Sequence, residues 1–294
     1  MTTRPAAGEI FDIGYRRYDG PRLGRGQAVA TLFWSSLRAT FGLGRSARSK
    51  IVPWGLTALA LLPAGVAVAV KALIGDAIQP FTYDNYLFSI SAAFGLFVAA
   101  QAPELVGGDQ RHRVLALYFS HPISRLDYAA AKLGALTTAL FLIALVPQLL
   151  LFAGRVLASA DVISALGDEI GALVQIVGSS LLYSITLGSI GLAIAAFTPR
   201  RAYATAAIIA VLLISGAVSA LLIEVGSGVL ADVAPLLDVY VVLDGVRDWL
   251  FGGTNADSPL ARTTLPLPVF GAVAAGIVAI SLGALVLRYR RIAA

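Results

Sequence analysis

Six long runs without a charged residue most constrain how this chain can fold. They cover residues 51–70, 85–103, 133–154, 170–199, 202–223 and 263–287. Each run has 19 residues or more, and a helix needs about 20 residues to cross a hydrocarbon layer about 30 Å thick. The runs lack the alternation of apolar and polar residues that strands of a membrane barrel require. Because backbone groups in lipid must be hydrogen-bonded within the chain, we predict an all-α integral membrane protein with six transmembrane helices.

The distribution of basic residues predicts the orientation in the membrane. Of 22 Lys and Arg residues, eighteen fall in the N-terminal tail, the second and fourth loops and the C-terminal tail, and four fall in the other segments. Lys and Arg are retained on the cytoplasmic side of a membrane. We therefore expect a multi-pass protein of the cell membrane with both termini in the cytoplasm. The net charge of +5 does not indicate nucleic-acid binding, because the basic residues are dispersed over four short segments.

The region before the first run divides into two parts. Residues 1–26 predict an irregular cytoplasmic tail, and residues 27–43 predict an amphipathic helix. Apolar residues recur there at every fourth position, as Val29, Phe33, Leu37 and Phe41. Trp34 and the basic residues that follow favour a helix lying in the headgroup layer. A soluble cap packed on the helix ends is the alternative.

The segment between the fifth and sixth runs, residues 224–262, is too long for a plain turn. Its apolar patches are interrupted by Asp232, Asp238, Asp244 and Asp248, and carboxylates at this frequency exclude another span. We predict short helices on or dipping into the outer membrane face. The transmembrane domain then covers residues 51–288, and residues 289–294 form a cytoplasmic tail.

The sequence lacks the motifs of common catalytic and cofactor sites. It contains no P-loop, no Gly-x-Ser-x-Gly elbow and no His-Glu-x-x-His. With no cysteine and two histidines, His112 and His121, a metal site is not expected. The centres of all six runs are neutral, which disfavours ion-coupled transport. We therefore expect no catalytic, cofactor-binding or metal-ligating residue in this chain, and energy supplied by another subunit.

The second cytoplasmic segment, residues 104–125, is the most informative part of the sequence. Gly107-Gly108 is expected to end the second span, Asp109 to cap a new helix, and residues 113–119 to form a short helix that ends before Pro122. A short helix protruding from a membrane domain can dock into a groove of a cytoplasmic partner. An ordinary loop helix lying on lipid headgroups fits the pattern equally well.

In architecture and in this segment, the chain resembles the membrane subunit of type-two ABC exporters. The resemblance rests on an acidic residue closing the second span at Pro103-Glu104, an apolar stretch Leu115-Ala116-Leu117-Tyr118-Phe119, and Pro122-Ile123-Ser124-Arg125, followed by Tyr128 and Lys132. It covers about residues 27–291 in architecture. Where the family commonly has Gly-Lys before the third span, this chain has Ala131-Lys132.

The resemblance implies a permease subunit of an ATP-binding-cassette exporter, coupled to a separate cytoplasmic ATPase that holds ATP and Mg. A second permease subunit, in a homodimer or heterodimer, is implied as well. Spans two and five would line the path, and the segment between spans five and six would resemble the family's extracellular gate helices. The implied coupling residues are Glu104, Asp109, Arg111, Arg113, Leu117, Tyr118 and Arg125. The transported substrate is not implied.

Two other classes of function remain open at this point. A membrane scaffold or assembly factor without transport activity would use the same short helix to recruit a partner other than an ATPase. An intramembrane enzyme is disfavoured, since no span carries a catalytic pair.

Overall fold

The computed structural model describes residues 20, 24–75, 81–112, 114–159, 161–198, 200–252 and 259–291. Within these residues all regular structure is helical, and no strand occurs. The elements are α1 (Arg25–Thr40), α2 (Ala47–Ile74), α3 (Tyr83–Ser89), α4 (Ser91–Arg111), α5 (Leu115–Phe119), α6 (Arg125–Leu157), α7 (Val162–Glu169), α8 (Ala172–Phe197), α9 (Arg201–Ile209), the π-helical turn η2 (Ala210–Ile214), α10 (Ser215–Val225), α11 (Val229–Val233), the 3-10 turn η3 (Ala234–Leu237), α12 (Val239–Phe251), the 3-10 turn η4 (Pro259–Arg262) and α13 (Leu267–Arg291). The all-α prediction is confirmed.

The described residues contain five helices long and apolar enough to cross a membrane, and six if a bent pair counts as one span. The five are α2, α6, α8, the continuous helix over residues 201–225, and α13. The bent pair is α3 with α4, whose axes differ by 46°. Each of the six uncharged runs overlaps one of these spans.

The bend between α3 and α4 was not expected from the uncharged run 85–103, which overlaps both helices. Contacts to other helices hold α3. The Gln175 amide donates a hydrogen bond of 2.5 Å to the Asp84 carboxylate, and Arg247 donates to the Asp84 backbone carbonyl. These contacts tie α3 to α8 and α12 and hold it in its own direction.

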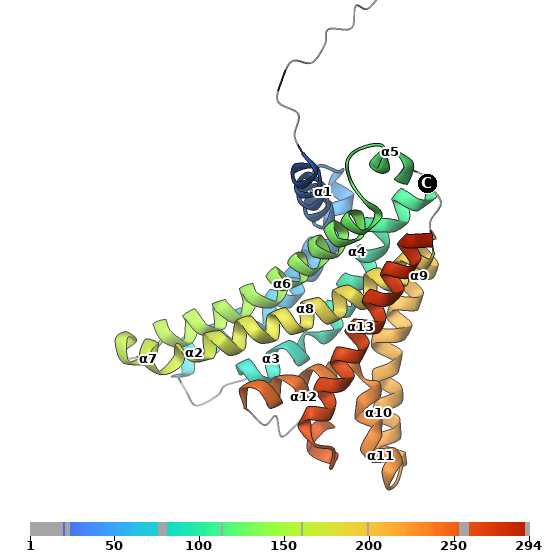
Figure 1. The fold of residues 1–294 in the computed structure, drawn as a ribbon. Helices are drawn as coiled ribbons and strands as arrows, with labels where there is room; N and C mark the ends of the chain where they lie inside the picture. The colour runs from blue at the N-terminus through green and yellow to red at the C-terminus, as the bar shows by residue number, and fades with distance from the viewer. Residues whose placement is uncertain are drawn as a thin grey trace, which may run out of the picture.

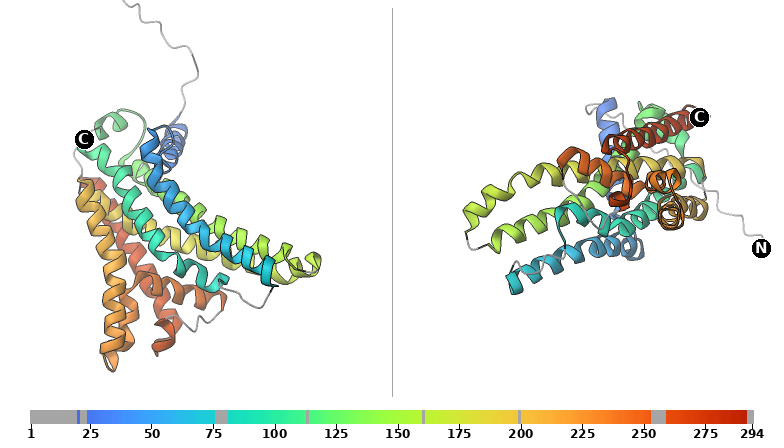
Figure 2. Two further views of the ribbon diagram at one scale, coloured as in Figure 1. Left: turned by 180° about the vertical axis from the view of Figure 1, so that it is seen from behind. Right: turned by 90° about the horizontal axis from the view of Figure 1, so that it is seen from below.

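The α8 helix lies at the centre of the bundle. In its most apolar stretch 72% of residues are buried, against 17% in α2 and in the helix over residues 201–225. The helices converge at the end that carries α1, α5 and the last turn of α13 (Figure 1) and splay apart toward the opposite end. Figure 2 shows the same divergence from behind, with α2, α6 and α8 running toward α7 while α9, α10 and α13 run in another direction.

A helix, α1, occupies most of the segment 27–43 predicted as an amphipathic helix; it begins two residues earlier and ends three residues earlier than expected. Leu32 and Leu37 are buried on its inner face. The Phe33 ring faces Gly134 on α6 and would lie 3.5 Å from a Cβ added to that glycine. Trp34 on the other face is 60% exposed. The helix therefore packs on the bundle along one side and leaves an aromatic side chain free on the other.

Close approach between α4 and α8 depends on a glycine. A Cβ added to Gly191 on α8 would overlap the Val98 side chain on α4. Both residues lie in the buried centre of the bundle, where Val98 is fully buried. Small residues allow helix backbones in a membrane to approach closely.

We predict that Gly191→Ala destabilises the protein by about 1–3 kcal/mol, because the extra methyl group overpacks the contact with Val98. The measurement is the thermal unfolding midpoint of the purified protein in detergent. Val98→Ala in the same chain should restore part of the loss. Gly276→Ala on α13, where the new methyl group meets open space, is the matched control. Equal midpoints for Gly191→Ala and Gly276→Ala would contradict this account of the packing.

Candidate coupling site

The five-residue helix α5 is held against the bundle by aromatic side chains. The rings of Tyr118 and Phe119 lie 5.5 and 6.3 Å from the ring of Tyr128 in the first turn of α6. The Tyr128 ring lies 5.4 Å from that of Tyr289 near the end of α13, and both of these tyrosines are fully buried. Such tilted and edge-to-face pairs are favourable arrangements for aromatic rings. We call these four residues the aromatic cluster; it fixes α5 to the ends of α6 and α13.

An ion pair next to the aromatic cluster joins α4 to α6. The Lys132 ammonium lies 2.9 Å from Asp109 Oδ2, and the Tyr128 hydroxyl donates a hydrogen bond of 2.6 Å to the same oxygen. The Lys132 side chain is 8% exposed and that of Asp109 is 20% exposed. Charges shielded to this degree interact more strongly than a surface pair does. The position of α4 relative to α6 is therefore fixed beside α5.

Backbone carbonyls near the ends of α8 and α13 complete this network. The Arg125 guanidinium donates to the Arg290 carbonyl at 3.1 Å. Gln110 and Arg288 both donate to the Ala196 carbonyl, at 3.1 and 3.0 Å. The last carbonyls of a helix lack partners within the helix, so side chains of neighbouring elements satisfy them. The ends of α4, α6, α8 and α13 are thereby connected at one end of the molecule.

Glu104, which precedes Asp109 on α4, makes a separate ionic contact. Its carboxylate contacts Arg45, at 3.2 Å, and Arg201 at the start of α9. Two guanidinium groups thus share one carboxylate, which joins the segment between α1 and α2 to α4 and α9.

The α1 helix is joined to the same end of the molecule by a bidentate contact. Arg25 Nε and one terminal nitrogen lie 2.8 Å from the two carboxylate oxygens of Asp127, which also caps α6 by accepting from the Ser124 backbone. The hydrogen bonds to Asp127 raise the pKa of Arg25. Because Arg25 is exposed, this pair orients α1 more than it stabilises the fold.

The structure brings some of the predicted coupling residues together and separates others. Asp109, Tyr118 and Arg125 meet around the aromatic cluster. Glu104 makes a separate ionic contact, and Arg111 and Leu117 are exposed. Arg113 lies outside the described residues. Of the two predicted apolar anchors, Tyr118 packs inward, whereas the Leu117 side chain is 67% exposed.

The expected break at Gly107-Gly108 is wrong. The α4 helix continues through both glycines to Arg111, and Asp109 is a residue of that helix rather than a cap of the next one. The short helix begins at Leu115, two residues after Arg113. Glycine disfavours a helix by only about 1 kcal/mol, and continuing the helix places Asp109 against Lys132 and Tyr128. The protruding helix is correspondingly shorter than predicted.

A second polar cluster lies on α12 and was missed by the sequence analysis. Arg247 contacts Asp244 at 2.8 Å and Asp248 at 2.6 Å, and the Tyr183 hydroxyl of α8 donates to Asp244 at 2.8 Å. Asp244 and Arg247 are fully buried. Burial raises the pKa of the Asp244 carboxyl to about 6, while contact with Arg247 and Tyr183 acts in the opposite direction. The spacing of these residues at i, i+3 and i+4 was the available signal, because it places all three charges on one helix face.

Neither polar cluster has the composition of a metal centre. In the part of the chain that the structure describes, no group of three or more His, Asp or Glu side chains is arranged to hold a metal ion. Asp109 is paired with Lys132, and Asp244 and Asp248 both contact Arg247. Their geometry serves to connect helices.

Comparison with known proteins gives one result at the level of families. A family model described as "ABC-2 family transporter protein" matches residues 68–288. A search of curated proteins found no match. The matched residues include α4, α5 and α6 and therefore the whole aromatic cluster except for Tyr289.

We predict that Lys132→Met destabilises the protein by about 2–3 kcal/mol, because it leaves the Asp109 carboxylate shielded and without its counter-ion. Adding Asp109→Asn removes that charge and keeps an oxygen that can accept from Tyr128, so the double variant should regain most of the stability. The thermal unfolding midpoint in detergent is the measurement. A double variant no more stable than Lys132→Met alone would argue against this ion pair.

Proposed function

The chain belongs to the ABC-2 transporter family, and from this premise we propose that it is the permease subunit of an ABC exporter, driven by a separate cytoplasmic ATPase. Members of this family are membrane translocation components. The observation that carries the proposal for this chain is Leu117, which is exposed on a short helix whose neighbouring residues are fixed to the spans. A surface loop would not need such an attachment.

The proposed coupling works by rigid contact. Leu117 inserts into a groove of the ATPase, in the way that helices commonly dock through apolar side chains. A displacement of α5 then reaches α6 and α13 through the aromatic cluster, and α4 through Asp109 and Lys132. Arg111 and Arg113 act as steering charges at the rim of the contact. ATP and Mg are held by the ATPase, which supplies the energy of hydrolysis.

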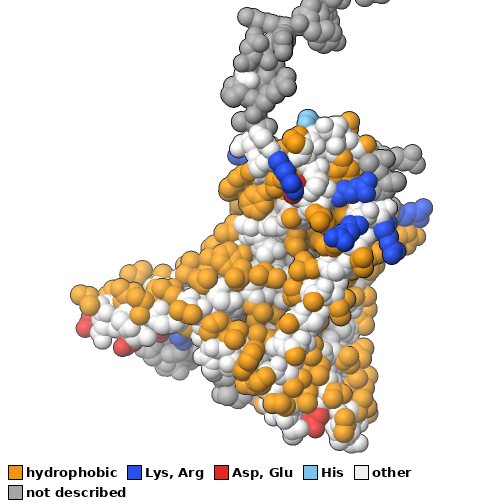
Figure 3. All heavy atoms as spheres, in the orientation of Figure 1, with side chains coloured by type: hydrophobic (Ala, Val, Ile, Leu, Met, Phe, Trp, Pro, Cys, Tyr) orange, Lys and Arg blue, Asp and Glu red, His pale blue; other side chains and the backbone are white. Residues whose placement is uncertain are grey.

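The proposed orientation places both termini, α1 and α5 in the cytoplasm. It is supported by the eighteen basic residues in the four segments assigned to that side. On the face drawn in Figure 3, most of the blue side chains gather around the end that carries α1 and α5, and most of the red ones lie at the opposite ends. In this orientation α1 lies at the membrane interface with Trp34 in the headgroup layer, and the short helices from α11 to α12 lie toward the outer face.

The complete transporter is proposed to contain two permease subunits, identical or different, and two ATPase subunits. The second and fifth spans, α3–α4 and the helix over residues 201–225, would line the path between the permeases. This assignment rests on the family and not on a contact between copies.

We predict that Leu117→Ala weakens association with the ATPase by about 1–3 kcal/mol, because truncating a buried anchor of an interface has this cost. Tyr118→Ala should also weaken association, by loosening α5 from Tyr128. Arg111→Ala should have a smaller effect that declines with added salt. The measurement is the amount of ATPase that co-purifies with the tagged chain, with substrate-stimulated hydrolysis as a second readout.

Leu157→Ala is the matched control, since Leu157 is 72% exposed at the far end of α6 and cannot reach a cytoplasmic partner in the proposed orientation. Full ATPase binding and stimulated hydrolysis by both Leu117→Ala and Tyr118→Ala would refute the coupling role. Co-purification of a partner without ATPase activity, in an equal amount, would favour the scaffold alternative.

Labelling of single introduced cysteines tests the proposed orientation, because the chain has no cysteine of its own. Ser46→Cys, at the start of α2, should react with a membrane-impermeant thiol reagent only from the cytoplasmic side. Ser164→Cys, on α7, should react only from the outside. The measurement is labelling in intact cells compared with inverted vesicles. The reverse pattern at either position would contradict the proposed topology.

A further inference from the structure

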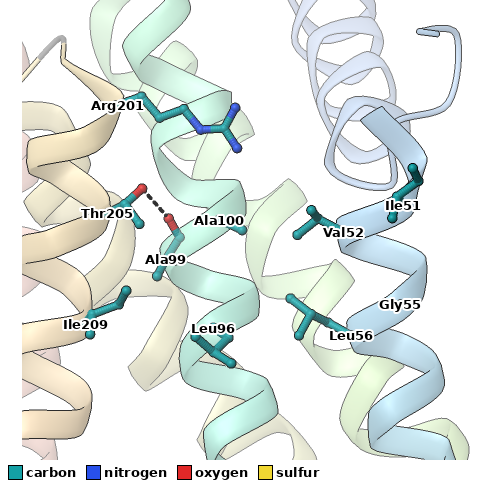
Figure 4. A pocket seen from close by; sticks show the side chains of 10 residues that line it. All are labelled: Ile51, Val52, Gly55, Leu56, Leu96, Ala99, Ala100, Arg201, Thr205 and Ile209. Carbon is teal, nitrogen blue, oxygen red and sulfur yellow. Dashed lines mark hydrogen bonds between the residues drawn. The ribbon is translucent and has the colours of Figure 1, made fainter. Parts of the chain in front are cut away.

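Polar contacts join the diverging helices at both ends of the molecule. At the end that carries α1 and α5, the Thr205 hydroxyl of α9 donates to the Ala99 carbonyl of α4 at 2.9 Å (Figure 4). Toward the opposite end, α12 lies beside α13 and close to α3 (Figure 1). There Arg247 connects α12 to α3, and Asp244 connects it to α8. Both of these charged side chains are fully buried, so the strength of this connection depends on their charge.

Glycines let α12 pack closely on α13. A Cβ added to Gly245 on α12 would overlap the Phe270 side chain, and a Cβ added to Gly271 on α13 would overlap the Trp249 ring. Small residues permit such close approach of helices. A movement of α13 away from α8 would therefore carry α12 with it and open the polar cluster on α12.

The polar cluster on α12 places two carboxylates against one guanidinium. Arg247 Nε and one terminal nitrogen donate to Asp248 Oδ1 at 3.1 and 2.6 Å, and the other terminal nitrogen donates to Asp244 Oδ1 at 2.8 Å. A third carboxylate, that of Asp84 on α3, accepts from the neutral amide of Gln175. Burial raises the pKa of Asp248, and the charge of Asp84 adds to this effect. Negative charge is therefore in excess around Arg247.

Asp244 is the carboxylate of this cluster that best fits a proton-binding role. Its Oδ1 accepts from Arg247 and from the Tyr183 hydroxyl, each at 2.8 Å. Its Oδ2 is buried and accepts no hydrogen bond from any residue that the structure describes. Burial of a carboxyl disfavours its charged form. Burial accordingly raises the pKa of Asp244 to about 6, against the opposing effect of Arg247.

We propose that Asp244 Oδ2 is a proton-binding site, which holds its proton while α12 is attached to α3 and α8 and releases it when they separate. On release the O–H bond breaks, the proton passes to water, and a hydrated carboxylate remains. Because the attached state binds the proton more tightly than the separated state, acid strengthens the attachment and alkali weakens it. In the proposed orientation of the chain, the proton comes from the outer medium, but the site itself does not depend on that orientation.

The titratable groups of the elements packed around Asp244 have defined effects or other partners. Besides burial, which has the largest effect, Arg247 and Tyr183 lower the pKa of Asp244 and Asp248 raises it. The α13 helix carries such groups only in its last turn, and η3 carries none. Groups that contact other partners are Tyr83 and Tyr86 of α3, Asp238 of α12, Glu224 of α10 and Arg262 of η4.

The experiment is hydrogen–deuterium exchange of the purified full-length chain in nanodiscs at several pH values from 5 to 8. Protection of the α12 backbone amides, corrected for the pH dependence of the chemical exchange rate, measures how often α12 separates. The pKa of Asp244 is about 6 in the attached state and has its ordinary value of 3.8 after separation. Protection in the wild-type chain should therefore be about tenfold higher at pH 5 than at pH 8. Amides of α1, at the other end of the molecule, should show no such increase.

Three substitutions of Asp by Asn assign the proton. Asp244→Asn should hold protection at its high value at every pH, because the amide cannot ionise and its oxygen still accepts from Arg247 and Tyr183. Asp248→Asn should keep the pH dependence and move its midpoint to lower pH, because Arg247 then serves Asp244 alone. Asp232→Asn on α11 is the matched control and should behave as the wild-type chain does, since Asp232 contacts Thr264.

Equal protection of α12 at pH 5 and pH 8 in the wild-type chain would overturn the proposal. A pH dependence that survives in Asp244→Asn and disappears in Asp248→Asn would do the same, because it would assign the proton to Asp248. If Asp244→Asn fails to fold, the direction of the midpoint shift in Asp248→Asn decides the question. The measurement contains neither ATPase nor substrate, so its outcome is separate from that of the coupling experiments.

Discussion

The absence of water in the hydrocarbon layer is the constraint on which the rest of this structure depends. Backbone groups there are satisfied within helices, and charged side chains between helices need partners. In the described residues, the least exposed charges are paired: Lys132 with Asp109, and Arg247 with Asp244 and Asp248. The pair of Lys132 and Asp109 joins α6 to α4. The pairs of Arg247 lie within α12, which contacts α3 and α8. Charged side chains that would be unfavourable in lipid therefore pair with one another and connect helices of the bundle.

These connections explain why the two ends of the molecule differ. At one end, the aromatic cluster and the carbonyl contacts of Arg125 and Arg288 gather the ends of four helices around Tyr128. Towards the other end, α12 is tied to α3 and α8 by Arg247 and Tyr183. The spans between are held by apolar packing around α8. The proposed coupling site lies at the first end.

The spans and the presence of a helix at α1 could be predicted from the sequence, because they depend on local composition. Long uncharged runs and a four-residue repeat of apolar positions need no knowledge of neighbours. The end of α4 could not be predicted. Gly107 and Gly108 signal a break by their own propensities, but Tyr128 and Lys132, which lie on the next long helix α6, hold Asp109 in a continuing helix.

The candidate coupling site, too, could be predicted only in part from the sequence. The sequence identified the segment that carries α5, but it could not show that Tyr118 packs on Tyr128 while Leu117 remains exposed. Both are apolar residues next to each other, and their environments depend on α6. The cluster on α12 was missed because its carboxylates were taken only as evidence against another span. Tyr183, which donates to Asp244, and Asp84, whose backbone carbonyl accepts from Arg247, lie on other helices.

Because the spans splay apart, a small tilt of α6 at the end that carries α5 produces a larger displacement at its other end. This helix has 33 residues, so at 1.5 Å per residue it is about 50 Å long. A tilt of about 5° about its anchored end would move its far end by about 4 Å. That far end lies beside α2 and α8, away from α9, α10 and α13 (Figure 1). A small rotation at the end that carries α5 is therefore sufficient for a displacement close to the width of a side chain on the opposite side of the membrane.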